Sequence, residues 1–246
     1  MDFRAAFRFP FRGRDKWANL GLVLVCFLIP FVGGIVVIGY QMIMERRLIA
    51  DIDAEAPRFD FGQFTNYLKI GLWPFLVSLV IMLPLMLLMY LPIFVGLFAI
   101  IVAFQKYPVL LIGGIMLLVI AWMLFLGIIV ALVQPLVLKS GLEQTFDKAF
   151  SWTFFKSWWQ KVGWLSVGVM LALMGAWFGV YLLTACTIIG PYVIVPVGFF
   201  VGAHVQAQLY RLYLERGGVP LVIQEEGLIG TFPVVPVVVP PPQAGP

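Results

Sequence analysis

The sequence predicts an all-α fold, a polytopic transmembrane helical bundle of about five or six membrane segments with interfacial amphipathic helices. The chain is 62% hydrophobic and only 11% charged, whereas a soluble domain is roughly 25% charged. No soluble fold of this size buries that much apolar surface, so the excess must face lipid. Its charged residues also act as separators. The runs without Asp, Glu, Lys or Arg are 17–44, 70–105, 107–138 and 162–210.

The first apolar run, 17–44, is long enough to cross a bilayer once. However, Pro30 and Gly33-Gly34 interrupt it near its middle. A broken backbone at that depth is tolerated where neighbouring helices cover it. The segment is therefore predicted either as a kinked span or as a re-entrant hairpin.

The run 70–105 would be roughly 54 Å long as one helix, which is too long for a single span without extreme tilt. Pro84 and Pro92 divide it. We therefore predict a span at 70–90 and a shorter apolar helix at 92–105. After Lys106-Tyr107-Pro108, a further span runs to Leu138.

The last run, 162–210, must fold back because it would be roughly 73 Å long as one helix. Gly190-Pro191 is the natural break, since proline cannot continue a helix and glycine permits a turn. The predicted spans are 163–185 and 191–212.

These boundaries divide the chain into a basic, aromatic N-terminal arm (1–16), a transmembrane helical domain (17–216) and an extended proline-rich tail (217–246). Basic residues favour the cytoplasmic side of a membrane. We therefore expect both termini in the cytoplasm. The basic residues other than Lys106 are Arg4, Arg8, Arg12, Arg14 and Lys16 in the arm, Arg46, Arg47, Arg58 and Lys69 in the second group, Lys139, Lys148, Lys156 and Lys161 in the third, and Arg211 and Arg216 in the last.

The segment 142–150 has apolar residues on one helical stripe, with Glu143, Asp147 and Lys148 off that stripe. An aromatic-rich stretch with two lysines follows it. This pattern is typical of an interfacial helix that leads into an aromatic belt. It serves either as a lipid-sensing or partner-docking platform or as a plain membrane anchor. The candidate interfacial and partner-binding residues are Phe146, Phe150, Trp152, Phe155, Trp158 and Trp159.

His204, Gln208 and Arg211 occur at i, i+4 and i+7, hence on one face of the last predicted span. Ionisable residues at membrane depth are functional candidates by default. These three are the candidate intramembrane polar residues, for transport or proton relay. The alternative is that His204 hydrogen-bonds a neighbouring helix, since Arg211 already marks the membrane surface.

The sequence offers no catalytic, cofactor-binding or metal-ligating residues. Its two cysteines, Cys26 and Cys186, lie inside apolar runs, where single thiols act as small hydrophobes. With one histidine, the common zinc ligand sets and a histidine-based relay are hard to assemble. We therefore expect that the protein is not an enzyme and needs no cofactor.

Short motifs recur in order at the ends of the apolar runs. They are Gly39-Tyr40, Arg46-Arg47, Pro57-Arg58-Phe59-Asp60, Tyr67-Leu68-Lys69-Ile70-Gly71, Pro84, Gln134-Pro135, Thr145-Phe146-Asp147-Lys148-Ala149-Phe150 and Ile188-Ile189-Gly190-Pro191. In order and spacing they resemble a family of prokaryotic polytopic proteins known as domain of unknown function 4013, over residues 10–216. The aromatic stretch 152–159 and the proline-rich tail depart from that pattern. The resemblance implies a membrane location and architecture. It supplies no activity and no catalytic residue that could be assigned to this chain.

The leading hypothesis is a non-enzymatic accessory, scaffold or assembly subunit in the inner membrane of a prokaryote. Its expected partners are membrane lipids and other membrane proteins or a second copy of itself, and no nucleic acid is expected. Gly175 and Gly179 form a small-xxx-small pair, which permits close helix packing. The alternative is a channel or transporter for a small or lipidic solute, which would use the proline-kinked spans and His204.

Overall fold

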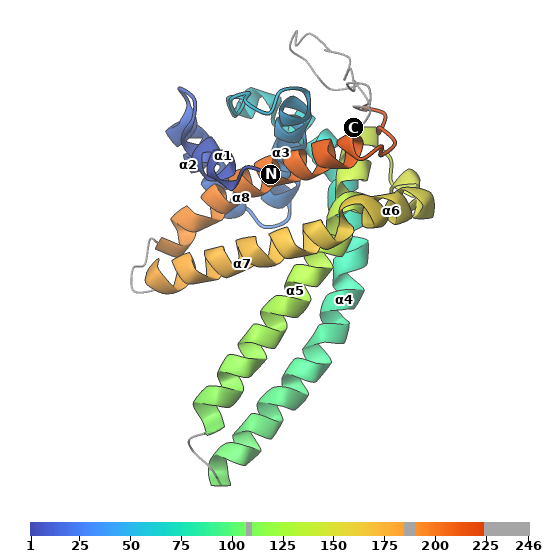
Figure 1. Cartoon of the computed structure of the whole chain (residues 1–246). Coiled ribbons are helices and arrows are strands. Elements are labelled where there is room, and N and C mark those ends of the chain that lie inside the picture. The colour runs from blue at the N-terminus through green and yellow to red at the C-terminus, as the bar shows by residue number, and fades with distance from the viewer. Residues whose placement is uncertain (107–109, 185–189, 224–246) are drawn as a thin grey trace.

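The computed structural model describes residues 1–106, 110–184 and 190–223, and the regular structure within these ranges is helical throughout. Two long helices, α4 (Phe64–Lys106) and α5 (Leu110–Glu143), form a hairpin that projects from the rest of the molecule (Figure 1). The other helices gather around the end of this hairpin where α4 begins and α5 ends. We call this part, residues 1–63 and 144–223 without 185–189, the head.

The N-terminal arm begins with α1 (Phe3–Arg8), where the Asp2 side chain accepts a hydrogen bond from the backbone N–H of Ala5. A 3₁₀ turn, η1 (Phe9–Phe11), follows. Phe9 is completely buried, and its ring lies 6.2 Å from that of Phe200 in α8 (Gly190–Glu215). The arm is therefore packed against α8 rather than free.

The first apolar run forms a hairpin of two helices, α2 (Lys16–Phe27) and α3 (Val32–Ala50), and not one kinked span. Asn19 of α2 and Tyr40 of α3 lie at equal distance from the turn, and both donate hydrogen bonds to the carbonyl oxygen of Pro57. The two helices are therefore antiparallel. At about 18 Å, α2 is too short to cross a hydrocarbon core of about 30 Å. Apolar side chains at the tip, such as Phe31, are exposed.

The predicted break of the second run at Pro84 and Pro92 is wrong, because α4 continues through both prolines and through Pro74. A proline removes one backbone hydrogen bond and bends a helix. In an apolar surrounding there is no water to replace the remaining bonds, so the helix is kept on both sides of each proline. The separate short helix expected at 92–105 is part of α4.

Within the described residues, three helical stretches are long and apolar enough to cross a membrane: Phe61–Val102, Gly113–Glu143 and Trp152–Thr184. The chain is thus a multi-pass membrane protein, and its described residues hold fewer candidate spans than the five or six predicted. The α2–α3 hairpin and the unbroken α4 account for part of the difference. The predicted break near Gly190 is confirmed, since α7 (Trp164–Thr184) ends before it and α8 begins there.

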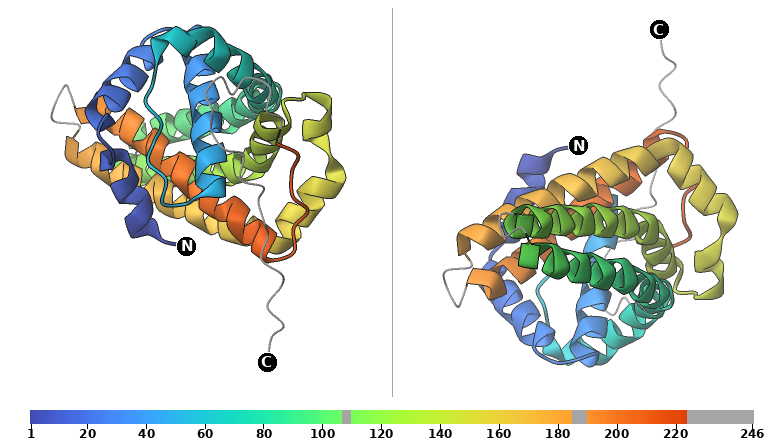
Figure 2. Two further views of the ribbon diagram at one scale, coloured as in Figure 1. Left: turned by 90° about the horizontal axis from the view of Figure 1, so that it is seen from above. Right: turned by 90° about the horizontal axis from the view of Figure 1, so that it is seen from below.

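Helices α7 and α8 run side by side in both views of Figure 2, and α7 also crosses the end of α5 that joins the head. The His204 half of α8 is buried inside the head, where the side chains of Phe200, Val201 and Val205 are almost fully covered. The predicted span 191–212 therefore corresponds to a helix that is part of the core of the head.

The prediction of one interfacial helix over 142–150 is also wrong, because these residues do not form a single helix. Helix α5 ends at Glu143, and Gln144 takes a left-handed backbone conformation with φ of 51°. A 3₁₀ turn η3 (Asp147–Phe150) then leads to α6 (Trp152–Trp158), a π-helical turn η4 (Trp159–Gly163) and α7. The Gln144 side chain stabilises the turn, since it donates to the carbonyl oxygens of Gly141 and Ile70.

Candidate functional site

The three polar residues predicted for the last span line one open cleft of about 360 Å³ on the head. It lies between the N-terminus, the chain that follows α3, and the second half of α8. His204, Gln208 and Arg211 contribute from α8. The other lining residues are Met1, Asp2, Ala5, Ile52, Asp53, Leu212 and Glu215.

Gln208 joins the N-terminal arm to α8. Its Oε1 accepts a hydrogen bond of 2.7 Å from the backbone N–H of Asp2, and its Nε2 donates to the carbonyl oxygen of Asp2 at 2.9 Å. The same Nε2 lies 2.9 Å from Nδ1 of His204. Because an amide nitrogen only donates, His204 accepts at Nδ1 and is neutral in this arrangement.

Burial lowers the pKa of His204 below its ordinary value, and the backbone of Ile52 and the charges of Asp53 and Asp2 oppose this only in part. The ring packs against Phe9 at a centroid distance of 5.1 Å. His204 is thus a neutral residue between the arm and the core of the head. Its described contacts include the hydrogen bond with Gln208 of its own helix and the ring contact with Phe9.

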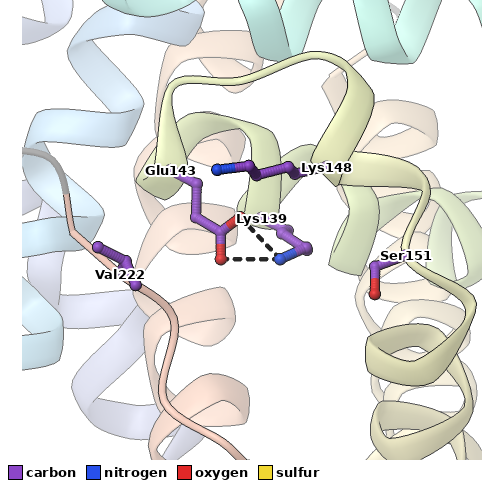
Figure 3. Close-up of a pocket in the computed structure, with 5 residues that line it drawn as sticks. All are labelled: Lys139, Glu143, Lys148, Ser151 and Val222. Atoms are coloured by element: carbon purple, nitrogen blue, oxygen red, sulfur yellow. Dashed lines mark hydrogen bonds and ion pairs between the residues drawn. The ribbon is translucent and has the colours of Figure 1, made fainter.

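A second cleft, of about 380 Å³, lies where α5 ends and the chain turns into α6 (Figure 3). Lys139 and Glu143 are one helical turn apart on α5, and the Lys139 ammonium lies 2.7 Å from both carboxylate oxygens. Lys148 extends across the same opening, and Ser151 and Val222 complete the lining. The ion pair is about nine-tenths buried.

The aromatic candidates divide into exposed and buried residues. Trp152 is 72% exposed and stacks on Phe155, which in turn stacks on Trp159. Phe150, also exposed, packs on Phe146 at 5.4 Å. These five are on or near the surface beside the second cleft.

Trp158 differs from the other aromatic candidates, since it is 1% exposed. It packs against Phe154 and against Tyr213 of α8, with ring centroids 6.1 Å and 5.2 Å away. It is a core residue of the head and does not belong to the exposed aromatic surface that includes Phe150 and Trp152.

A buried polar group on α3 was not predicted from the sequence. Glu45 is completely buried and accepts a hydrogen bond of 2.6 Å from Gln41, and burial raises its pKa to about 8. The Arg46 side chain donates to the carbonyl oxygen of Gly141, and burial lowers its pKa to about 10. The spacing of Gln41 and Glu45, one helical turn apart beside an apolar run, was a signal for this group.

A line of small residues runs along the middle of α7. Gly168, Ala172, Gly175 and Gly179 follow a 4-3-4 spacing, which places them along a single line on the helix. Gly168, Ala172 and Gly175 are exposed. A Cβ atom added to Gly168, Gly175 or Gly179 would meet no atom within 4 Å. We call these four residues the α7 seam.

In the described part of the chain, no three His, Cys, Asp or Glu side chains form a group that could hold a metal ion. Cys26 is a buried free thiol, and Cys186 lies outside the described residues. Residues 224–246, which include most of the proline-rich tail, also lie outside them.

The model of a family described as protein of unknown function (DUF4013) matches residues 22–204. Neither the comparison with curated proteins nor that with solved structures gives a match.

Proposed function

This chain belongs to the DUF4013 family of proteins of unknown function, and from that premise we propose that it acts by association, as a non-enzymatic accessory, scaffold or assembly subunit of a membrane complex. The observation that carries this proposal is the α7 seam. A line of glycine and alanine on a candidate span has a known physical use, which is to let a second helix approach closely.

The seam has no partner within the described chain. The faces of α7 that carry Val169, Met170 and Leu173 are buried in the head, whereas the seam is on the uncovered side. In a bilayer, apolar burial alone does not drive helices together, because lipid is equally apolar. Close backbone approach is therefore what a small-residue seam adds, and it fits another transmembrane helix better than it fits lipid.

The distribution of charge supports one orientation. The lysines and arginines, apart from Lys106 at the end of α4, lie in the head or in the turns of α4 and α5 nearest to it. The positive-inside rule then favours the cytoplasmic side for the charged turns of the head, in the inner membrane of a prokaryote. The N-terminus, bound through Asp2 to Gln208, would be cytoplasmic as well.

No observation on the described residues favours the alternative, a channel or transporter. His204, its central residue, lies in a cleft of the head, hydrogen-bonds Gln208 and packs against Phe9 of the arm. The hairpin partners α4 and α5 pack on each other, and their outer faces, for example Leu88 at 66% and Phe98 at 70%, are exposed apolar surface. Among the described residues these helices do not line a polar path.

The test is the mass of the protein, with whatever co-purifies, in mild detergent, measured by light scattering and native mass spectrometry. Gly175→Leu fills the seam, and the added Cβ atom meets no other atom within 4 Å. The matched control is Gly21→Leu on α2, where a glycine is also exposed and unpacked. We expect the wild type and Gly21→Leu to purify as a complex with a second copy or another membrane protein, and Gly175→Leu to lose it.

A wild-type protein that is strictly monomeric and free of partners, both in detergent and after cross-linking in the native membrane, would contradict the proposal. Equal loss of association in Gly175→Leu and Gly21→Leu would also contradict it, because the seam would then have no specific part.

A further inference from the structure

We propose that the cleft lined by Lys139, Glu143, Lys148, Ser151 and Val222 binds the phosphate of an anionic phospholipid. This inference goes beyond association through the α7 seam and does not depend on it. It follows from where the cleft lies, from its charge and from the surface beside it.

The cleft lies between the ends of two candidate spans. One candidate span ends at Glu143 and the next begins at Trp152, and the cleft is lined by residues from the end of the first and from the turn between the two. Such a turn lies at the level of the lipid headgroups, because hydrocarbon begins where the apolar spans begin. The ligand within reach at that level is the phosphate of a neighbouring lipid.

The cleft has more positive than negative charge. It contains two lysines and one carboxylate. A lysine ammonium has three donors, and Glu143 takes two of those of Lys139. The third is not used by any hydrogen bond among the described residues. Lys148 is exposed and directed across the same opening (Figure 3). A phosphate there would accept from both lysines and from the hydroxyl of Ser151.

Lys139 is held in place for this role. Besides its ion pair with Glu143, the ammonium lies 5.4 Å from the centre of the Phe154 ring, in cation–π geometry. A lysine that is already fixed loses little further conformational entropy when it binds a ligand. The cleft is therefore preorganised on the Lys139 side and open on the Lys148 side.

The surface beside the cleft suits the rest of a lipid. Phe150 and Trp152 flank Ser151 in the chain, and both side chains are exposed. Aromatic rings of this kind lie at the boundary between headgroups and acyl chains. A lipid whose phosphate occupies the cleft would place its glycerol and upper acyl chains on these rings. This explains why exposed aromatic residues occur beside the two lysines of the cleft.

The experiment is a lipid titration of the full-length protein in detergent, read by native mass spectrometry. Phosphatidylglycerol, which is anionic, is compared with phosphatidylcholine, whose phosphate is neutralised by its own choline. Lys148→Gln is the test variant. Lys156→Gln is the matched control, since Lys156 is also exposed, lies in α6 outside the cleft, and its loss changes the net charge equally.

We expect phosphatidylglycerol to bind better than phosphatidylcholine, and Lys148→Gln to weaken phosphatidylglycerol binding about fivefold, as loss of one lysine–headgroup contact would. Lys156→Gln should leave the affinity nearly unchanged. Glu143→Gln should strengthen binding, because it removes the carboxylate that competes with the phosphate for Lys139.

Equal weakening in Lys148→Gln and Lys156→Gln would overturn the proposal, since it would mean that only net charge matters. Equal binding of the two lipids would overturn it as well. A third measurement adds inorganic phosphate in excess: if this displaces phosphatidylglycerol from the wild type, the cleft takes free phosphate and the assignment to lipid is wrong.

Discussion

Gly39 of α3 and Gly71 of α4 lie against each other with no side chain between the two helices. A Cβ atom on Gly71 would be 2.7 Å from the backbone nitrogen of Gly39 and closer still to the carbonyl oxygen of Ile35. A Cβ atom on Gly39 would likewise overlap the carbonyl oxygen of Tyr67. This contact fixes the α2–α3 hairpin to the start of the long hairpin, so it sets how the head is attached to the α4–α5 hairpin.

Gly39→Ala should destabilise the protein by about 3 kcal/mol or more, because the clash is with backbone, which cannot move aside as a side chain can. The control is Gly34→Ala on the same helix, where an added Cβ meets nothing within 4 Å. That change should be neutral or stabilising by up to about 1 kcal/mol, since alanine favours helix. Thermal unfolding of the detergent-solubilised variants measures both, and equal effects would contradict the close approach.

Asn19 connects the start of α2 to the chain that precedes α4. Its amide donates to the carbonyl oxygen of Pro57 at 3.1 Å and accepts from the backbone N–H of Phe59 at 2.8 Å, and it is 2% exposed. Asn19→Ala leaves a buried backbone N–H without a partner, which costs about 1–3 kcal/mol. We expect a corresponding fall in the free energy of unfolding. Gln160→Ala, at an exposed position, is the control and should change it by less than about 0.5 kcal/mol.

Glu45 should make the stability of the head depend on pH. Its pKa in the fold is raised to about 8 from an ordinary value of 4.5. Its contribution to stability is therefore fully present below pH 4.5 and is lost as the pH rises through about 8. The Glu45→Gln variant has no carboxyl group that must lose a proton inside the fold. At pH 9 this variant should therefore be more stable than the wild type by about 2 kcal/mol. At pH 5 the two proteins should differ little.

The comparison is made between unfolding curves of the wild type and Glu45→Gln at both pH values. Glu215→Gln, at an exposed position on α8, serves as the control for a general effect of charge. A difference between Glu45→Gln and the wild type that does not grow with pH would show that Glu45 is not held protonated in the fold.

Gln208→Leu should release the N-terminal arm, because it removes both hydrogen bonds to Asp2 and the one to His204. Arg4 and Arg8 are exposed on α1, and proteases cleave helical segments only after they open locally. We expect trypsin to cut the variant after these arginines several times faster than it cuts the wild type. Cleavage rates that stay equal would mean that the packing of Phe9 alone holds the arm.

The all-helical membrane fold could be predicted from the sequence because it depends on composition and on runs without charge. The break near Gly190 was also predictable, since 162–210 is too long for one span. The continuity of α4 was not, because the effect of Pro84 and Pro92 depends on what surrounds the helix. The sequence left open whether the first run forms a hairpin or a span. The hairpin depends on a tertiary contact, since Asn19 and Tyr40 both donate hydrogen bonds to the carbonyl oxygen of Pro57.

The candidate sites show the same limit. The helical spacing of His204, Gln208 and Arg211 placed them correctly on one face. It gave no information on what that face would meet, which is Asp2 at the start of the chain. Likewise Trp152 and Trp158 look equivalent in the aromatic stretch, but one is exposed and the other is buried against Tyr213. Only the packing of α8 distinguishes them.

The π-helical turn Trp159–Gly163 makes the exact number of residues between α6 and α7 important. A π turn holds one residue more than an α-helical turn, and one residue rotates a helix by about 100°. Deleting Gln160 would therefore restore a regular helix while swinging the α7 seam around the helix axis, away from its present outward direction. Insertions and deletions in this stretch should be tolerated far less than substitutions, because a variant of altered length here would have to find new neighbours for the buried side chains of α7, Val169, Met170 and Leu173.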